Sequence, residues 1–200
     1  MNRRDFLKSS GVLAAAATLS PVMTACGNEA ARLSGMKNIP DTYDTDLLVV
    51  GGGPAGTCAA IAAARMGVKT IIMDSGNCLG GMATKGLVGP FMTCYDRYGE
   101  RMIIKGIFGE IVDRLVEKNW AIHPEHVRWE SPYTAWIKAG HDHVTPFDPE
   151  GLKVILETMC GEAGVKILYH TNFVETIMNG NSAAGAVVLQ KQGLGKIRAR

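Results

Sequence analysis

The sequence predicts an α/β fold in which helices flank a parallel sheet and an antiparallel hairpin region is added toward the C-terminal end. Two short apolar runs, 47–50 and 70–73, have the character of buried parallel strands. Between them, 54–66 is an alanine-rich helix with proline in its first turn and a glycine as its stop. Residues 173–189 hold two strand-like runs joined by Asn-Gly, which favours a reversing turn because both residues tolerate positive φ.

The turn between the first strand and this helix carries the spacing Gly51-x-Gly53-x-x-Gly56. In such a turn the first glycine permits the tight bend, the second lets the backbone approach a pyrophosphate, and the third lets helix and strand pack closely. Phosphates bind the free N–H groups and positive dipole of the helix N-terminus. The second strand ends on Asp74, whose carboxylate can accept hydrogen bonds from both hydroxyls of a ribose. Together these parts predict a dinucleotide site.

A second glycine loop, Leu79-Gly80-Gly81-Met82-Ala83-Thr84, follows the second strand almost at once. A nicotinamide-binding domain has no need of glycines there, whereas FAD lies extended across the sheet and presses its pyrophosphate and flavin end against such a loop. The loop therefore favours FAD, and an NAD(P)-dependent dehydrogenase with the same fingerprint is the alternative. The predicted cofactor-binding residues are Gly51, Gly52, Gly53, Pro54, Ala55, Gly56, Asp74, Ser75, Gly80, Gly81, Met82 and Thr84.

These motifs make the chain resemble the two-dinucleotide-binding-domain flavoproteins, and among them the FAD-dependent oxidoreductases that share their FAD domain with the flavoprotein subunit of heterodisulfide reductase. The likeness rests on residues 49–56 and 79–84, with support from 106–115, 147–153 and 164–188. It implies a Rossmann-like FAD-binding domain and hydride transfer between the flavin and a small molecule. It also implies that backbone groups near Val174 hold the adenine, with Phe173 as the other candidate.

The N-terminal pattern and the resemblance together predict how the chain is organised. We expect a signal peptide (1–26), a tether (27–43), a first FAD-binding βαβ segment (44–90), an insertion facing the substrate side (91–147) and a return to the FAD-binding domain (148–200). In the resembling family a late acidic, glycine-rich motif closes over FAD, and this sequence contains none. We therefore expect a fold incomplete at its C-terminus, as in the N-terminal part of a longer flavoprotein. A non-catalytic exported fragment that has lost FAD is a further alternative.

The remaining elements follow ordinary patterns. Apolar residues at four-residue spacing predict a helix over 107–115, and Asp148 starts another whose apolar face runs to Met159. Strands are predicted over 165–169 and 196–200. No acid–base pair is tied to the flavin, so no catalytic residue can be named.

The insertion loses periodicity between residues 119 and 146, where aromatic residues and histidines lie among turn residues. His141-x-His143 could place two imidazoles on one side of an extended segment, but no third ligand accompanies them, so no metal site is predicted. The histidines there are His123, His126, His141 and His143, which we expect in solvated loops.

Five scattered cysteines contain no C-x-x-C pair. A 4Fe-4S cluster is therefore implied only by the family resemblance. Cys58, Cys78 and Cys94 are expected to be structural.

The formal net charge is +2, and no basic patch with interleaved aromatics is present, so nucleic acid is not an expected partner. The expected partners are a small-molecule substrate and an electron acceptor that the sequence does not identify.

The N-terminus has the features of a targeting signal. Arg3-Arg4, followed by Phe6-Leu7-Lys8, has the twin-arginine pattern, and the apolar stretch 11–23 is too short to span a bilayer comfortably. Ala25-Cys26-Gly27 then resembles a lipoprotein box, which predicts lipidation at Cys26. We expect export of the folded, FAD-loaded protein to the periplasm or cell envelope. Contact with a membrane is expected only through the signal or the lipid anchor.

Overall fold

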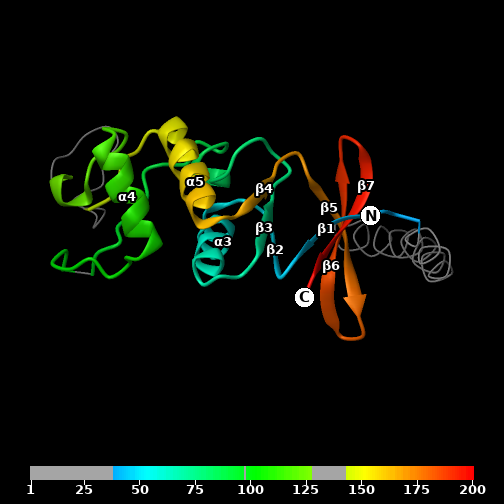
Figure 1. Cartoon of the computed structure of the whole chain (residues 1–200). Coiled ribbons are helices and arrows are strands. Elements are labelled where there is room, and N and C mark those ends of the chain that lie inside the picture. The colour runs from blue at the N-terminus through cyan, green and yellow to red at the C-terminus, as the bar shows by residue number, and fades with distance from the viewer. Residues whose placement is uncertain (1–37, 97, 128–142) are drawn as a thin grey trace, which may run out of the picture. The chain divides into compact units, whose positions relative to one another are not determined.

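The computed structural model describes residues 38–96, 98–127 and 143–200 (Figure 1). The chain divides into two units, Met1–Pro40 and Asp41–Arg200, and the elements below belong to the second. The predicted signal peptide and most of the predicted tether lie outside the described residues. No described helix is both long and apolar enough to cross a bilayer.

A three-stranded parallel sheet forms the centre of the dinucleotide-binding region. Its strands β2 (Leu47–Val50), β3 (Thr70–Met73) and β4 (Lys166–Leu168) lie in the order β2-β3-β4. The helix α3 (Pro54–Arg65) connects β2 to β3. The α/β class and this first βαβ unit are therefore as the sequence predicts.

The second sheet has four strands in the order β1-β7-β6-β5. The strands β5 (Asn172–Asn179), β6 (Ser182–Gln190) and β7 (Gly193–Ala199) pair antiparallel in succession, which confirms the predicted hairpin region. The strand β1 (Asp41–Thr45) pairs parallel with β7. Residues 41–43 therefore belong to a strand and not to the predicted tether. The polar run Asp-Thr-Tyr-Asp-Thr pairs with a strand far along the chain, which a local pattern does not reveal.

Each face of β3 packs against a different layer. Ile72 lies in a larger core formed with the helices, whereas Ile71 and Met73 lie in a smaller core with the second sheet. Because successive side chains of a strand point to opposite faces, one short apolar run serves both cores. This explains why all four residues of β3 are buried.

The helices α4 (Ile107–Glu117) and α5 (Pro149–Ala163) complete the larger core, close to the predicted positions. Asp148 begins α5 by accepting a hydrogen bond from the Glu150 N–H at 2.8 Å, an N-cap. Ion pairs on the surface join the three helices: Arg65 with Glu110, and Arg114 with both Glu110 and Glu162. The core of this layer contains Ile61, Ile72, Leu79, Leu115, Leu152 and Met159.

Candidate cofactor site

The two glycine loops predicted to hold the dinucleotide meet where β2 and β3 end. The Gly51 N–H donates to the Met73 carbonyl at 2.8 Å, and the Gly80 N–H donates to the Gly52 carbonyl at 2.7 Å. A Cβ on Gly81 would lie 3.1 Å from the Gly53 Cα, so the loops are in close contact. Gly51 has φ +104°, a conformation that favours glycine. The structure thus joins two loops that the sequence separates by a helix and a strand.

The third glycine of the fingerprint allows α3 to approach β2. A Cβ on Gly56 would overlap the carbonyl oxygen of Gly51 and lie 3.3 Å from a methyl of Val49. The Thr57 hydroxyl adds a hydrogen bond of 3.1 Å to the Gly52 carbonyl. The predicted packing role of Gly56 therefore has a direct steric cause.

The N-terminus of α3 has the properties that a pyrophosphate needs. Gly53 is its N-cap residue and no side chain caps it, so its first-turn N–H groups are available to an anion. A Cβ on Gly53 would meet nothing within 4 Å, which means that open space lies over this position. Pro54 and Ala55 are exposed beside it. These residues fit the phosphates of FAD.

Asp74 lies at the end of β3, and the structure gives it three hydrogen-bond donors. One carboxylate oxygen accepts from the Gly52 N–H at 2.9 Å. The other accepts from the Gly76 N–H at 2.7 Å and from the Lys85 ammonium at 2.6 Å. Burial alone would raise the pKa of Asp74, but the bonds from Lys85, Gly76 and Gly52 outweigh it and hold that pKa below its ordinary value. The carboxylate is therefore charged at neutral pH.

Lys85 is the site residue that the sequence analysis missed. Its ammonium uses one of about four acceptor positions of the Asp74 carboxylate, and the two backbone N–H groups use two more. One position remains, whereas two ribose hydroxyls need two. The ribose contact predicted for Asp74 thus requires the partly exposed Lys85 side chain to move aside. A lysine directly after the predicted loop carries no local signal that would have identified it.

The other residues of the second loop divide into two groups. Thr84 is fully buried, and its hydroxyl donates to the Leu79 carbonyl at 2.6 Å, so its side chain shapes the loop from within. Met82 is exposed, as is Ser75, which follows Asp74 and precedes the loop. Contact of any of these residues with a cofactor stays a prediction.

Val174 has a distinctive backbone environment. Phe173 pairs with Val188 and Glu175 with Val187, so a bulge leaves Val174 without a partner across the ladder. The segment before it reaches the site, since the Thr171 N–H donates to the Asp74 carbonyl at 3.0 Å. A strand position without a register partner fits the adenine contact implied for Val174.

The cysteines and histidines form no reactive or metal-binding group among the described residues. Cys26 and His141 lie outside the described residues. Within the described ranges, no group of three His, Cys, Asp or Glu side chains could hold a metal ion. Burial raises the pKa of Cys58 and Cys94, and it raises that of Cys160 to about 11. These three thiols are protonated near neutral pH and are poor nucleophiles.

Comparison with known proteins places these motifs in context. Residues 46–200 match the family of FAD dependent oxidoreductases, and residues 1–20 match the twin-arginine translocation pathway signal sequence. The digoxin reductase of Eggerthella lenta is 31% identical over 104 residues, which are 46% of this chain and 18% of that protein. The mitochondrial dihydrolipoyl dehydrogenase of Caenorhabditis elegans is 49% identical over 45 residues, 22% of this chain and 9% of that one. The chain thus spans less than a fifth of the length of these relatives.

Solved structures share the fold. The 3-ketosteroid-Δ4-(5α)-dehydrogenase of Rhodococcus jostii has a TM-score of 0.52 and 17% identity, over 81% of this chain and 47% of that one. A flavoprotein/dehydrogenase of Cytophaga hutchinsonii has a TM-score of 0.50 and 16% identity, over 78% and 38% of the two chains. At this level of identity the likeness establishes the architecture alone.

Proposed function

The chain belongs to the family of FAD dependent oxidoreductases, and from that premise we propose that it binds FAD across its two glycine loops and acts on a small molecule by hydride transfer. FAD, when bound, would supply the ring that accepts or donates the hydride. The residues of the chain would bind and orient it. The observation that carries the proposal is the direct contact between the loops, through the hydrogen bond from Gly80 to Gly52.

Each part of the site has its own task in this proposal. The uncapped N-terminus of α3, above Gly53, would bind the pyrophosphate. Asp74 would accept hydrogen bonds from the adenosine ribose once Lys85 has moved aside, and the backbone at the Val174 bulge would hold the adenine. Gly80 and Gly81 would face the flavin end of the molecule.

An NAD(P)-dependent dehydrogenase is the second enzyme class that this fingerprint serves. The second glycine loop, which is hydrogen-bonded to the first, argues against a dehydrogenase of this class. A nicotinamide site does not need glycines at positions 80 and 81. A non-catalytic exported fragment is the non-enzyme alternative. The closer kinship with heterodisulfide reductase stays a prediction, and no local cysteine motif supports iron–sulfur chemistry here.

The chain carries a twin-arginine signal sequence over residues 1–20, which supports export by that route. We further propose lipidation at Cys26 and residence in the periplasm or cell envelope. The reason is Cys26 itself, which follows Ala25 directly after an apolar stretch. The twin-arginine route transports folded proteins, which suits a cofactor that is inserted in the cytoplasm.

The flavin content of the purified full chain tests the proposed function. The expected result is a flavin absorbance spectrum and about one FAD per chain released on denaturation, with reduction of the bound flavin by a suitable donor. A protein that binds NAD(P)H and no flavin would establish the dehydrogenase alternative instead. Folded protein that binds neither nucleotide would support the non-catalytic fragment.

A further inference from the structure

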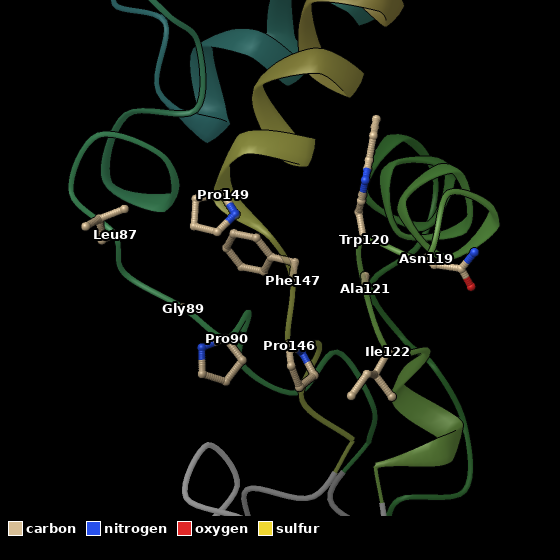
Figure 2. Close-up of a pocket in the computed structure, with 10 residues that line it drawn as sticks. All are labelled: Leu87, Gly89, Pro90, Asn119, Trp120, Ala121, Ile122, Pro146, Phe147 and Pro149. Atoms are coloured by element: carbon tan, nitrogen blue, oxygen red, sulfur yellow. The ribbon is translucent and has the colours of Figure 1, made fainter.

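A cavity of about 550 Å³ opens in the region predicted to face the substrate (Figure 2). Three segments distant in sequence form its walls: residues 87–90, 119–122 and 146–149. Its size falls within the range of about 300–1,000 Å³ that is typical of small-molecule sites. No predicted cofactor-binding residue lines it.

Backbone hydrogen bonds hold these walls in place. The Ile122 N–H donates to the Pro146 carbonyl at 3.0 Å, and the Asp148 N–H donates to the Trp120 carbonyl at 2.7 Å. The Phe147 ring, which lines the cavity, stacks on Phe91 with 4.2 Å between ring centroids. Figure 2 shows the rings of Phe147 and Trp120 on neighbouring parts of this lining. These contacts fix segments 119–122 and 146–149 relative to each other.

The lining determines which ligands the cavity favours. None of the ten lining residues has a charged side chain, and Asn119 is the only one with an amide side chain. The others include three prolines and the aromatic rings of Trp120 and Phe147. A charged ligand would lose its hydration here without gaining a partner of opposite charge, whereas a flat ring gains apolar and aromatic contact.

The cavity is connected to the second glycine loop. The Gly86 N–H donates to the Gly81 carbonyl at 3.2 Å, and the Val88 N–H donates to the Met82 carbonyl at 2.9 Å. The segment that begins the cavity wall at Leu87 is thus bonded back onto the loop that would face the flavin. Met82 and Leu87 are 65% and 71% exposed there, so apolar surface continues from the loop to the cavity.

We propose that this cavity is the substrate site and that it selects an uncharged, ring-bearing apolar molecule. The inference rests on the proposed function, since it needs a flavin beside the second loop. Two observations carry it: the lining has aromatic rings and no charged side chain, and the residues on either side of the lining residue Leu87 donate backbone hydrogen bonds to Gly81 and Met82.

Three probes of nearly the same shape test this selection: naphthol, naphthoate and naphthylmethylammonium, titrated into the FAD-loaded full chain by calorimetry. Ala121→Phe fills the cavity, because Ala121 lines it. Ala183→Phe makes the same change at an exposed residue of β6 and is the matched control. Ile122→Ser is a second variant that preserves the fold, since Ile122 is 52% exposed. The flavin absorbance is recorded in the same titrations.

The expected result is that naphthol binds at least about tenfold more tightly than either charged probe. Ala121→Phe should weaken naphthol binding by about tenfold or more, Ile122→Ser should weaken it less, and Ala183→Phe should leave it unchanged. Naphthol should also shift the flavin absorbance. Equal binding of all three probes, or undiminished binding to Ala121→Phe, overturns the proposed selection. Binding that leaves the flavin spectrum unchanged overturns the assignment as substrate site. If the purified chain contains no FAD, the proposed function is wrong, and the same calorimetry on the FAD-free chain still shows whether the cavity prefers the neutral probe.

Discussion

The ammonium of Lys85 lies 2.6 Å from the carboxylate of Asp74, the acid at the end of β3. Asp74 is only 9% exposed, so this pair sits at the inner edge of the candidate site. The pair neutralises the negative charge of Asp74 beside the candidate dinucleotide site. The Lys85 ammonium also occupies an acceptor position of the carboxylate that a ribose hydroxyl would need. Ribose binding and the ion pair with Lys85 therefore compete for the Asp74 carboxylate.

We expect Asp74→Asn to weaken FAD binding by about tenfold or more, because a charge-assisted hydrogen bond to the ribose contributes about 1.5–3 kcal/mol. The amide keeps the shape of the side chain but loses its charge. Quenching of FAD fluorescence on titration of the apoprotein measures the dissociation constant. Asp113→Asn, an exposed aspartate of α4, is the control. An unchanged dissociation constant for Asp74→Asn would remove Asp74 from the site.

Loss of the Lys85 ammonium should make the stability of the protein less dependent on pH. The pKa of Asp74 is lowered in the folded state, so its contribution is present above the unfolded pKa, near 3.9, and is lost as pH falls through the folded value. Lys85→Met should lower the free energy of unfolding by about 1 kcal/mol at pH 7, allowing for the partial exposure of Lys85. This difference should shrink below about pH 4. Urea titrations at several pH values, with the exposed Lys191→Met as control, provide the measurement. A difference that is constant across pH would contradict the pairing.

Gly56→Ala should destabilise the fold by about 1–3 kcal/mol, because the new Cβ would overlap the Gly51 carbonyl. Gly161→Ala is the matched control in α5, where a Cβ would meet nothing within 4 Å. That change should raise stability by up to about 1 kcal/mol, because alanine favours a helix more than glycine does. Chemical denaturation measures the free energy of unfolding of both variants. Equal stability of the two would show that α3 does not approach β2 as described.

Gly53→Val should abolish FAD retention while the fold is kept. Gly53 has an extended backbone conformation that valine also adopts, and only the open space over the α3 N-terminus is filled. FAD released on denaturation, divided by protein concentration, measures retention. Gly161→Val supplies the same change far from the loops. A Gly53→Val protein with about one FAD per chain would refute the pyrophosphate site.

Export and lipidation can be separated by two sets of substitutions. Replacing Arg3 and Arg4 by lysine keeps both charges but removes the paired guanidinium groups, so the precursor should stay in the cytoplasm. Cys26→Ala should still be exported but should carry no lipid. Fractionation of cells grown with a labelled fatty acid measures both export and lipid attachment. Normal export of the double-lysine protein would contradict the twin-arginine route, and label on Cys26→Ala would contradict the anchor.

The sequence predicts the first βαβ unit well because its signals are local. Strands β2 and β3 have the predicted bounds, and α3 ends one residue before the predicted Met66. Glycine spacing, proline at the helix start and a short apolar run act within a few residues of where they appear. The hairpin turn lies one residue later than predicted, at Gly180-Asn181, because Asn179 still pairs with Ser182 and Gly180 alone of the predicted pair has positive φ.

The sequence does not predict features that depend on distant partners. Strand β1 forms because β7 lies beside it, and its polar residues Asp41 and Asp44 pair with arginines near the other end of the chain. Lys85 reaches Asp74 through the length of its side chain, which no spacing rule encodes. The cavity likewise joins three separate segments.

The parallel pairing of β1 with β7 sets an order of events during synthesis. Residues Asp41–Thr45 leave the ribosome early, yet their partner Gly193–Ala199 follows only after more than a hundred further residues. The described strand nearest in sequence to the export signal therefore cannot pair with β7 until Gly193–Ala199 has been synthesised. A transport system that accepts only folded proteins would therefore not export a chain whose translation has not yet reached β7.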